Sequence, residues 1–400
     1  MNHHFQLIIQ MNEFIPFNRI FKNHKEQEAA AFALSGDCWH GDGPIGKRVE
    51  EQLNSWLGSR YTLLTTSCTH ALEMAMMVLE IGPGDEVIMP AFTFVSTANA
   101  VRLRGGTPVF AEIRDTDLTM DPEDVARKVT GATRAVIPIH YAGVSADFDG
   151  IRKALASSPS KGQKIAIVED AAQAVGAWWR DRALGTVGDI GCFSFHDTKN
   201  ITCGEGGAFL TQDDDLAEKA EWVREKGTNR SAFLRGEVDK YTWISPGSSY
   251  IPSDVLSSVL EVQLRKKEVI LDSRKAVWNS YRERLQEAED RGWIALPRIP
   301  SYARSNYHIF HFLVQRTSDR DPLIDVLRQE GIEATFHYIP LHNAPYARKN
   351  LGSDLSLPRT EKLAASLIRL PLYPDLINIR DDIADRVFSV LSQYFNAQGR

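Results

Sequence analysis

Short apolar runs alternate with longer helical runs along the middle of this chain, and this alternation restricts its fold more than any other feature. The short runs are rich in β-branched residues and are bounded by turn residues, as is typical of buried strands. The pattern predicts an α/β fold in which helices cover both faces of a mostly parallel sheet. The expected strands span residues 61–66, 86–89, 107–113, 134–139, 164–169, 191–195 and 206–211.

Right-handed crossovers place the carboxyl ends of parallel strands along one edge, where open α/β sheets bind ligands. Asp170 directly follows the run at 164–169, and Lys199 follows the run at 191–195 by four residues. Pyridoxal phosphate (PLP) requires an amine for a Schiff base and a carboxylate that keeps its ring nitrogen protonated. A single lysine in a polar turn is usually a solvated surface residue. The prediction therefore depends on the pair, and on His140 and the other residues expected at the same edge.

Two further segments at this edge suit other parts of such a cofactor. Ser67, Cys68 and Thr69 lie between a strand and a helix, where hydroxyl groups and free backbone N–H groups bind phosphate. An ordinary helix cap is the alternative interpretation. Phe92 or Phe94, at the end of the next strand, could stack on a flat ring, although a single phenylalanine is more often part of the core.

A long polar segment at residues 226–250 contains both cations and aromatic side chains. Loops of this length in a compact domain tend to be functional or disordered. Clustered cations with aromatic rings suit a phosphorylated substrate that carries a ring. A solvated loop and a contact between two subunits are the alternatives. The residues concerned are Lys226, Arg230, Arg235, Lys240, Tyr241 and Trp243.

Several classes of protein are disfavoured by composition. A net charge of −6 gives no footprint for nucleic acid. No apolar run approaches the ~18–20 residues of a membrane span, and the first residues lack the basic start of a signal peptide. The four cysteines have no zinc spacing and are expected to be reduced thiols in the cytoplasm. We assign no role to the first ten residues, because Met11 could begin the chain.

Two motifs are considered and rejected. The letters Gly41-x-Gly43-x-x-Gly46 match a dinucleotide fingerprint, but no strand is expected before them and no acidic residue follows at the required distance. His337 and His342 are five residues apart with a proline between them, so they cannot share a helical face. We therefore expect neither a nicotinamide site nor a metal site.

The last third of the chain predicts a second, smaller domain. A long helical stretch at 253–285, with Asp254 as its possible N-cap, leads into it. We expect domains at residues 14–262 and 263–400. The second would contain strands at 308–315 and 333–338 and helices at 322–330, 360–368 and 380–394.

Three motifs together resemble the DegT/DnrJ/EryC1/StrS family of sugar-nucleotide aminotransferases, over roughly residues 14–395. The resemblance implies the PLP-dependent fold type I, with a mostly parallel seven-stranded sheet and a smaller C-terminal α/β domain. It also implies a homodimer with active sites at the subunit interface. The motifs are P-x-F-T-F-V-S-T-A-N at 90–99, V-E-D-A-A-Q at 168–173 and F-S-F-H-D-T-K-N at 193–200.

The resemblance also implies roles for individual residues. Lys199 would form the Schiff base with PLP and then act as general base, and Asp170 would pair with the ring nitrogen. Gln173 would lie near the ring hydroxyl, and Phe94 would stack on the ring. The residues implied for the phosphate are Cys68, Thr69, Ser194 and, from the partner subunit, Ser249. Ser249 stands where much of the family carries an asparagine, and the family's D-x-Q-A-A motif reads D-V-L-S-S at 254–258.

Segments 224–243 and 336–342 resemble one branch of the family, the dTDP-4-amino-4,6-dideoxygalactose transaminases. This implies transfer of an amino group from L-glutamate to dTDP-4-dehydro-6-deoxy-D-glucose, for enterobacterial common antigen or a related surface polysaccharide such as the O-antigen of lipopolysaccharide. The gluco-configured product and a catalytically silent dimeric relative remain alternatives. A deoxygenating relative would carry histidine in place of Lys199. The residues expected near the substrate are Lys226, Arg230, Arg235, Tyr338 and His342.

Overall fold

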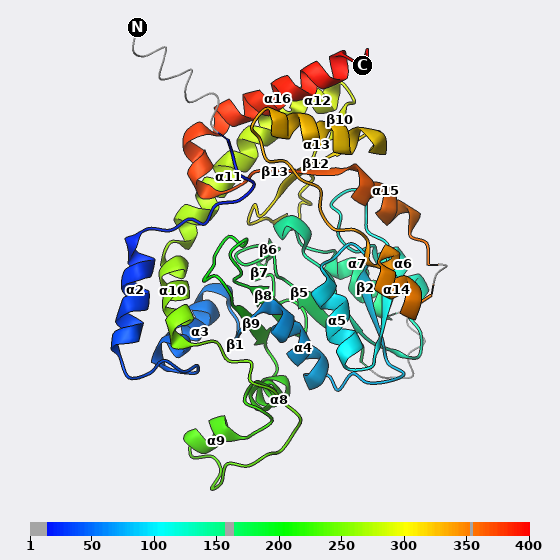
Figure 1. The fold of residues 1–400 in the computed structure, drawn as a ribbon. Coiled ribbons are helices and arrows are strands. Elements are labelled where there is room, and N and C mark those ends of the chain that lie inside the picture. The colour runs from blue at the N-terminus through cyan, green and yellow to red at the C-terminus, as the bar shows by residue number, and fades with distance from the viewer. Residues whose placement is uncertain (1–13, 157–163, 353–354) are drawn as a thin grey trace.

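The computed structural model describes residues 14–156, 164–352 and 355–400, and its centre is a seven-stranded sheet (Figure 1). The strand order is β1-β9-β8-β5-β4-β2-β3, and β9 runs antiparallel to both of its neighbours while the remaining pairs are parallel. This confirms the mostly parallel α/β sheet. Its strands are β1 (Tyr61–Thr65), β2 (Glu86–Pro90), β3 (Thr107–Ala111), β4 (Thr133–Val136), β5 (Ala166–Asp170), β8 (Ile190–Ser194) and β9 (Gly207–Thr211).

The described helices agree with most of the expected helical segments. They are α2 (His24–Ser35), α3 (Pro44–Leu57), α4 (Cys68–Val78), α5 (Val95–Leu103), α6 (Pro122–Lys128), α7 (Phe148–Ala156), α8 (Asp214–Arg224), α9 (Arg230–Leu234), α10 (Asp254–Arg265), α11 (Lys267–Arg284), α12 (Gln286–Asp290), α13 (Arg320–Gln329), α14 (Pro345–Asn350), α15 (Pro358–Ser366) and α16 (Arg380–Asn396). Short 3-10 helices span Tyr141–Gly143, Thr317–Asp319, Leu341–Asn343 and Pro374–Ile379.

Helices cover both faces of the sheet because successive side chains in a strand point to opposite faces. Leu64 and Ile88 join a core that also contains residues of α3, α6, α7 and α10. Their neighbours Leu63 and Val87 join a second core with residues of α4, α5 and α8. The strands are therefore apolar on both sides, as expected of a buried parallel sheet.

The glycine-rich segment at 41–46 lets the start of α3 pack closely against α10. Asp254 lies just after Ser253, which caps α10, so the expectation that Asp254 itself is the N-cap was wrong. The Asp254 carboxylate is buried and accepts hydrogen bonds from the backbone N–H groups of Ile45 (3.0 Å) and Gly46 (2.9 Å) at the start of α3. A side chain at Gly43 would collide with this carboxylate.

A third core surrounds a small antiparallel sheet, β10-β12-β13, together with α11, α13 and α16. Ile15 from the start of the described chain joins this core. The expected boundary at residues 262 and 263 falls within α10, and α10 gives way to α11 at Lys266. The division into two domains stays a prediction. The small-sheet strands are β10 (Ile294–Ala295), β12 (Phe310–Val314) and β13 (Leu367–Leu370).

Two local predictions in this region were wrong. Residues 333–338 form no strand, and only an isolated bridge joins Thr335 to Arg369. The helix expected to reach residue 368 ends at Ser366, and β13 follows without an intervening loop. The alternating letters at 333–338 imitate a strand, whereas β13 exists because its residues pair with β12.

Two peripheral features complete the fold. A second small sheet joins β6 (Trp178–Trp179), β7 (Arg182–Ala183) and β11 (Ala303–Arg304). The polar segment at 226–250 contains the short helix α9 and projects away from the sheet at the bottom of Figure 1. Among the described residues, no helix combines the length and apolar character that a membrane crossing requires.

Candidate active site

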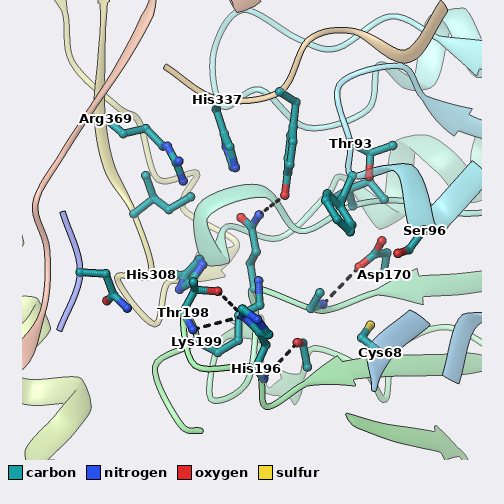
Figure 2. A pocket seen from close by; sticks show the side chains of 18 of the residues that line it. Cys68, Thr93, Ser96, Asp170, His196, Thr198, Lys199, His308, His337 and Arg369 are labelled. Atoms are coloured by element: carbon teal, nitrogen blue, oxygen red, sulfur yellow. Dashed lines mark hydrogen bonds between the residues drawn. The ribbon is translucent and has the colours of Figure 1, made fainter. Parts of the chain in front are cut away.

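A cavity of about 370 Å³ opens where the strand ends of the main sheet meet the small sheet. Its lining comes from the start of α4, the segment before α5, the end of β5, the turn after β8 and strand β13 (Figure 2). Eight residues that the sequence predicted for the site line this cavity. They are Cys68, Thr69, Phe94, Asp170, Gln173, Ser194, Lys199 and Tyr338.

Asp170 ends β5, and hydrogen bonds fix both oxygens of its buried carboxylate. The Thr97 hydroxyl donates to Oδ2 at 2.7 Å, and the Ala172 backbone N–H donates to Oδ1 at 3.2 Å. Burial raises the pKa of Asp170, while these two bonds and the charge of Lys199 oppose the rise. These contacts fix the carboxylate at the cavity and offset part of the cost of burying its charge.

Lys199 lies in the tight turn after β8, and its backbone N–H donates to the His196 carbonyl at 2.9 Å. The next residue anchors this turn, because the Asn200 amide accepts a hydrogen bond from His308 Nδ1 at 2.9 Å. Burial lowers the pKa of the Lys199 amine, while Cys68 and Asp170 oppose the fall. An amine with a lowered pKa is more often unprotonated, as a nucleophile or general base must be.

Glu169 precedes Asp170 but points to the other face of the sheet. It is fully buried, and its carboxylate accepts hydrogen bonds from the backbone N–H groups of Gly185, Val187 and Gly188. His140 donates to the same carboxylate through Nε2 at 2.9 Å, since its Nδ1 accepts the Ala146 N–H. His140 therefore lies at the expected edge of the sheet but does not line the cavity.

The start of α4 forms one end of the cavity. Ser67 caps this helix by accepting the His70 N–H at 3.1 Å, and the Thr69 hydroxyl lies 2.7 Å from the Ser96 hydroxyl. The N–H groups of Cys68 and Thr69 belong to the first turn, which has no intrahelical acceptors. Free N–H groups and the helix dipole make such an end a site for an anion. Burial raises the pKa of the Cys68 thiol, which is therefore neutral.

Aromatic side chains form another wall. Phe92 is buried in the core, whereas Phe94 is 56% exposed and lines the cavity, so Phe94 is the candidate for stacking. The Gln173 amide donates to the Tyr338 hydroxyl at 2.9 Å and accepts the Ala142 N–H at 2.7 Å. The ring of His337 stacks on Tyr338 with 3.7 Å between centroids. Gln173 and Tyr338 thus hold each other in place.

Five predicted residues lie away from this cavity in the single chain. Lys226, Arg230 and Arg235 belong to the projecting segment and pair with acidic residues, Lys226 and Arg230 with Glu225 at 3.5 and 3.3 Å. His342 is buried, and its Nε2 donates to Glu361 at 2.8 Å. Ser249 forms a backbone bridge to Glu225. Their roles toward substrate or cofactor stay predictions.

Several residues of the site were not predicted from the sequence. Thr97 lies within the motif at 90–99, and its position one turn after Thr93 on the edge of the sheet could have indicated it. His337 lies in the segment at 336–342, next to the predicted Tyr338. The others line the cavity but come from segments that were assigned no chemistry, so only their tertiary placement identifies them. They are Asn18, Arg274, His308 and Arg369.

None of the four cysteines is in a disulfide. Among the described residues, no group of three or more histidine, cysteine, aspartate or glutamate side chains could hold a metal ion.

Comparisons with known proteins agree with this geometry. The family model of the DegT/DnrJ/EryC1/StrS aminotransferases matches residues 21–391. A candidate sugar aminotransferase of Streptococcus pneumoniae, Spr1654 in its PMP form, has 26% identity and a TM-score of 0.87 over 97% of this chain and 100% of its own. The aminotransferase TlmJ of Streptoalloteichus hindustanus has 28% identity and a TM-score of 0.85 over 95% and 100%. DesV of S. venezuelae has 30% identity and a TM-score of 0.84 over 95% and 99%.

These matches cover nearly the whole of this chain and confirm the fold type I architecture expected from the sequence. The chain belongs to the DegT/DnrJ/EryC1/StrS aminotransferase family.

Proposed function

We propose that this sugar aminotransferase moves an amino group from L-glutamate to C4 of dTDP-4-dehydro-6-deoxy-D-glucose, giving dTDP-4-amino-4,6-dideoxy-D-galactose. Membership of the family makes the chain a PLP-dependent enzyme. The observation that carries the proposal is the position of Lys199 and Asp170 in one cavity, beside the free start of α4.

The residues of the cavity fit PLP on physical grounds. The cavity offers a buried amine, a buried carboxylate with fixed oxygens, and a helix start suited to phosphate. The close approach of β9 to that helix requires glycine, because a Cβ at Gly207 would lie 2.5 Å from the Cys68 backbone nitrogen. We assign Lys199 to covalent attachment, Asp170 to the ring nitrogen, Gln173 to the ring hydroxyl and Phe94 to stacking. Cys68, Thr69, Ser194 and the partner subunit's Ser249 are assigned to the phosphate.

PLP, when bound, supplies an electron sink for the carbanion that forms when an amino acid loses its Cα proton. The chain's own residues move and hold the protons. The Lys199 amine, once free, takes the proton from the donor's Cα, and its lowered pKa favours the unprotonated form that this step needs. The Asp170 carboxylate holds a proton on the ring nitrogen by charge and hydrogen bonding. In the second half-reaction the same amine returns a proton to C4 of the sugar.

The choice of sugar rests on two segments, R-E-K-G-T-N-R-S-A-F-L-R at 224–235 and F-H-Y-I-P-L-H at 336–342. We place Lys226, Arg230 and Arg235 near the nucleotide of the partner subunit's substrate. The projecting segment extends away from the sheet of its own chain (Figure 1), and none of the three residues lines that chain's cavity. Tyr338 and His342 are assigned to the substrate of their own chain. This assignment requires a homodimer with active sites at its interface. We propose that the enzyme works in the cytoplasm on a precursor of a surface polysaccharide.

The test is a reconstitution with a defined product. The purified protein is incubated with PLP, L-glutamate and dTDP-4-dehydro-6-deoxy-D-glucose, and NMR of the product sugar gives the configuration at C4. The galacto product supports the proposal, whereas the gluco product or an inert substrate overturns the assigned sugar. A protein without visible absorbance from bound PLP would instead be a silent relative.

A further inference from the structure

His308 lines the cavity and holds the residue that follows Lys199. The Asn200 amide nitrogen donates to the backbone carbonyl of Asn306 at 2.9 Å, so the Asn200 amide oxygen is the atom that faces His308. The contact of 2.9 Å between this oxygen and His308 Nδ1 therefore requires a hydrogen on Nδ1. Asn200 and His308 are both buried, and Figure 2 shows His308 in the same part of the cavity as Lys199.

A buried arginine fixes the segment that carries His308. Arg274, in α11, donates to the Tyr307 carbonyl at 3.1 Å and to the His308 carbonyl at 2.6 Å. Among the described residues no carboxylate pairs with this guanidinium, and burial lowers the pKa of Arg274 to about 9. Tyr307 has a left-handed φ of 55°, and its N–H donates to the Ser305 hydroxyl at 2.9 Å. A bulky residue keeps this conformation only where its surroundings impose it, and such strain is concentrated at functional sites.

The same segment is tied to the opposite wall of the cavity. The Asn306 amide donates to the backbone carbonyls of Gln173 and Val175, both at 2.9 Å. Gln173 itself lines the cavity. Residues 305–308 therefore contact the turn of Lys199 on one side and the segment of Gln173 on the other.

Resting on the proposed function, we propose that His308 is a positioning residue for Lys199. Its Nδ1–H holds the Asn200 side chain, and with it the backbone from which the lysine side chain starts. A reacting nitrogen that is displaced by about 1 Å reacts much more slowly, because attack depends on distance and alignment. Nδ1 keeps its hydrogen whether the ring is neutral or charged, so this hydrogen bond does not depend on the charge of the ring.

The second ring nitrogen offers a competing explanation. Among the described residues no hydrogen bond reaches His308 Nε2, so this atom could instead accept one from a hydroxyl group of the sugar. Burial lowers the pKa of His308 well below its ordinary value, so Nε2 carries no hydrogen and is not a base near neutral pH. Two substitutions separate the nitrogens. His308→Asn keeps an N–H donor near the position of Nδ1 and leaves nothing at Nε2, whereas His308→Leu removes both.

Covalent attachment of PLP tests the lysine without an amino donor or a sugar. In this step the Lys199 nitrogen bonds to the aldehyde carbon, and the aldehyde oxygen leaves as water. The apoprotein is mixed with PLP and the absorbance of the attached cofactor is followed, while calorimetry with PMP, which forms no bond to the lysine, reports on the rest of the site. His308→Leu should slow attachment by roughly 10- to 100-fold and leave the PMP affinity within about threefold. His308→Asn should recover most of the rate.

Turnover and a control variant complete the design. The reaction with L-glutamate alone, and that of the PMP-loaded enzyme with the keto-sugar nucleotide alone, should slow by the same factor in His308→Leu, because both use the Lys199 amine. Asn200→Ala removes the acceptor of the same hydrogen bond, so it should match His308→Leu, and the double variant should be no slower than either. His24→Leu removes an exposed histidine from a pair with Glu28 and should change none of these quantities.

Several results would overturn this inference alone. They are an unchanged rate of attachment in His308→Leu, a His308→Asn variant that is as slow as His308→Leu, and a loss confined to the KM for the sugar nucleotide. The melting temperature of each variant is measured as well, and a PMP affinity that falls together with it would make His308 a residue of the fold only. A wild type that never attaches PLP would overturn the proposed function too.

Discussion

The hydrogen bond from Thr97 to Asp170 gives a direct test of how this site keeps a buried carboxylate charged. Thr97→Val preserves the shape of the side chain but removes the donor that lies 2.7 Å from Oδ2. A hydrogen bond to a charged group contributes about 1.5–3 kcal/mol. At 1.36 kcal/mol for each pKa unit, the pKa of Asp170, already raised by burial, should rise by roughly one to two units further.

The sign of the effect on activity follows from this shift. A carboxylate with a higher pKa is protonated over a wider acid range, and in that range it cannot hold the proton of the ring nitrogen. The acid limb of the pH–rate profile should therefore move toward neutral pH by about one unit or more, and PLP should bind more weakly on that side. The assay is the rate of the glutamate half-reaction, together with a spectroscopic titration of PLP, at a series of pH values.

Thr93 provides a matched control. Its hydroxyl lies 3.0 Å from that of Thr97, which is the hydroxyl that donates to Asp170, so Thr93→Val removes a neighbour of the donor but not the donor itself. The acid limb of the pH–rate profile should move by less in Thr93→Val than in Thr97→Val. An acid limb of Thr97→Val within about 0.3 units of the wild type would refute the reasoning, since the bond would then contribute less than about 0.4 kcal/mol.

Three further outcomes are expected. Lys199→Ala and Lys199→Arg should abolish turnover in a coupled glutamate assay, and an unchanged rate would contradict the assigned base. Asp254→Ala leaves two backbone N–H groups at the start of α3 without their buried acceptor, and should lower the free energy of unfolding by about 3 kcal/mol or more in denaturant titrations. Gly207→Ala places a Cβ 2.5 Å from the Cys68 backbone nitrogen, so it should displace the start of α4 and weaken PLP binding at least about tenfold. A normal PLP affinity in that variant would mean that the backbone there can move.

Local sequence patterns were sufficient to predict the main sheet, because the signals that specify its strands, helices and turns are short-range. The β-branched runs, the helical periods between them and the turn residues that separate them each act within a few residues of themselves. They located the strands of the sheet, and with them Asp170 at the end of β5 and Lys199 after β8. The antiparallel direction of β9 was not predicted, because direction depends on its neighbours in the sheet rather than on its own residues.

The small sheet shows where local pattern fails. Residues 333–338 alternate like a strand but pair only once, at Thr335, whereas Leu367–Leu370 became a strand directly after a helix. Pairing with β12 decided that outcome, and propensity within the segment did not.

The sequence by itself determined the α/β sheet, the edge at which its chemistry lies, and the lysine and carboxylate at that edge. Only the tertiary structure decided which distant side chains complete the site, among them Thr97 beside Asp170 and Arg369 opposite it. The physical reason is that periodicity fixes which face of its own element a residue occupies, whereas contacts between α5, β5 and β13 depend on how those elements pack together.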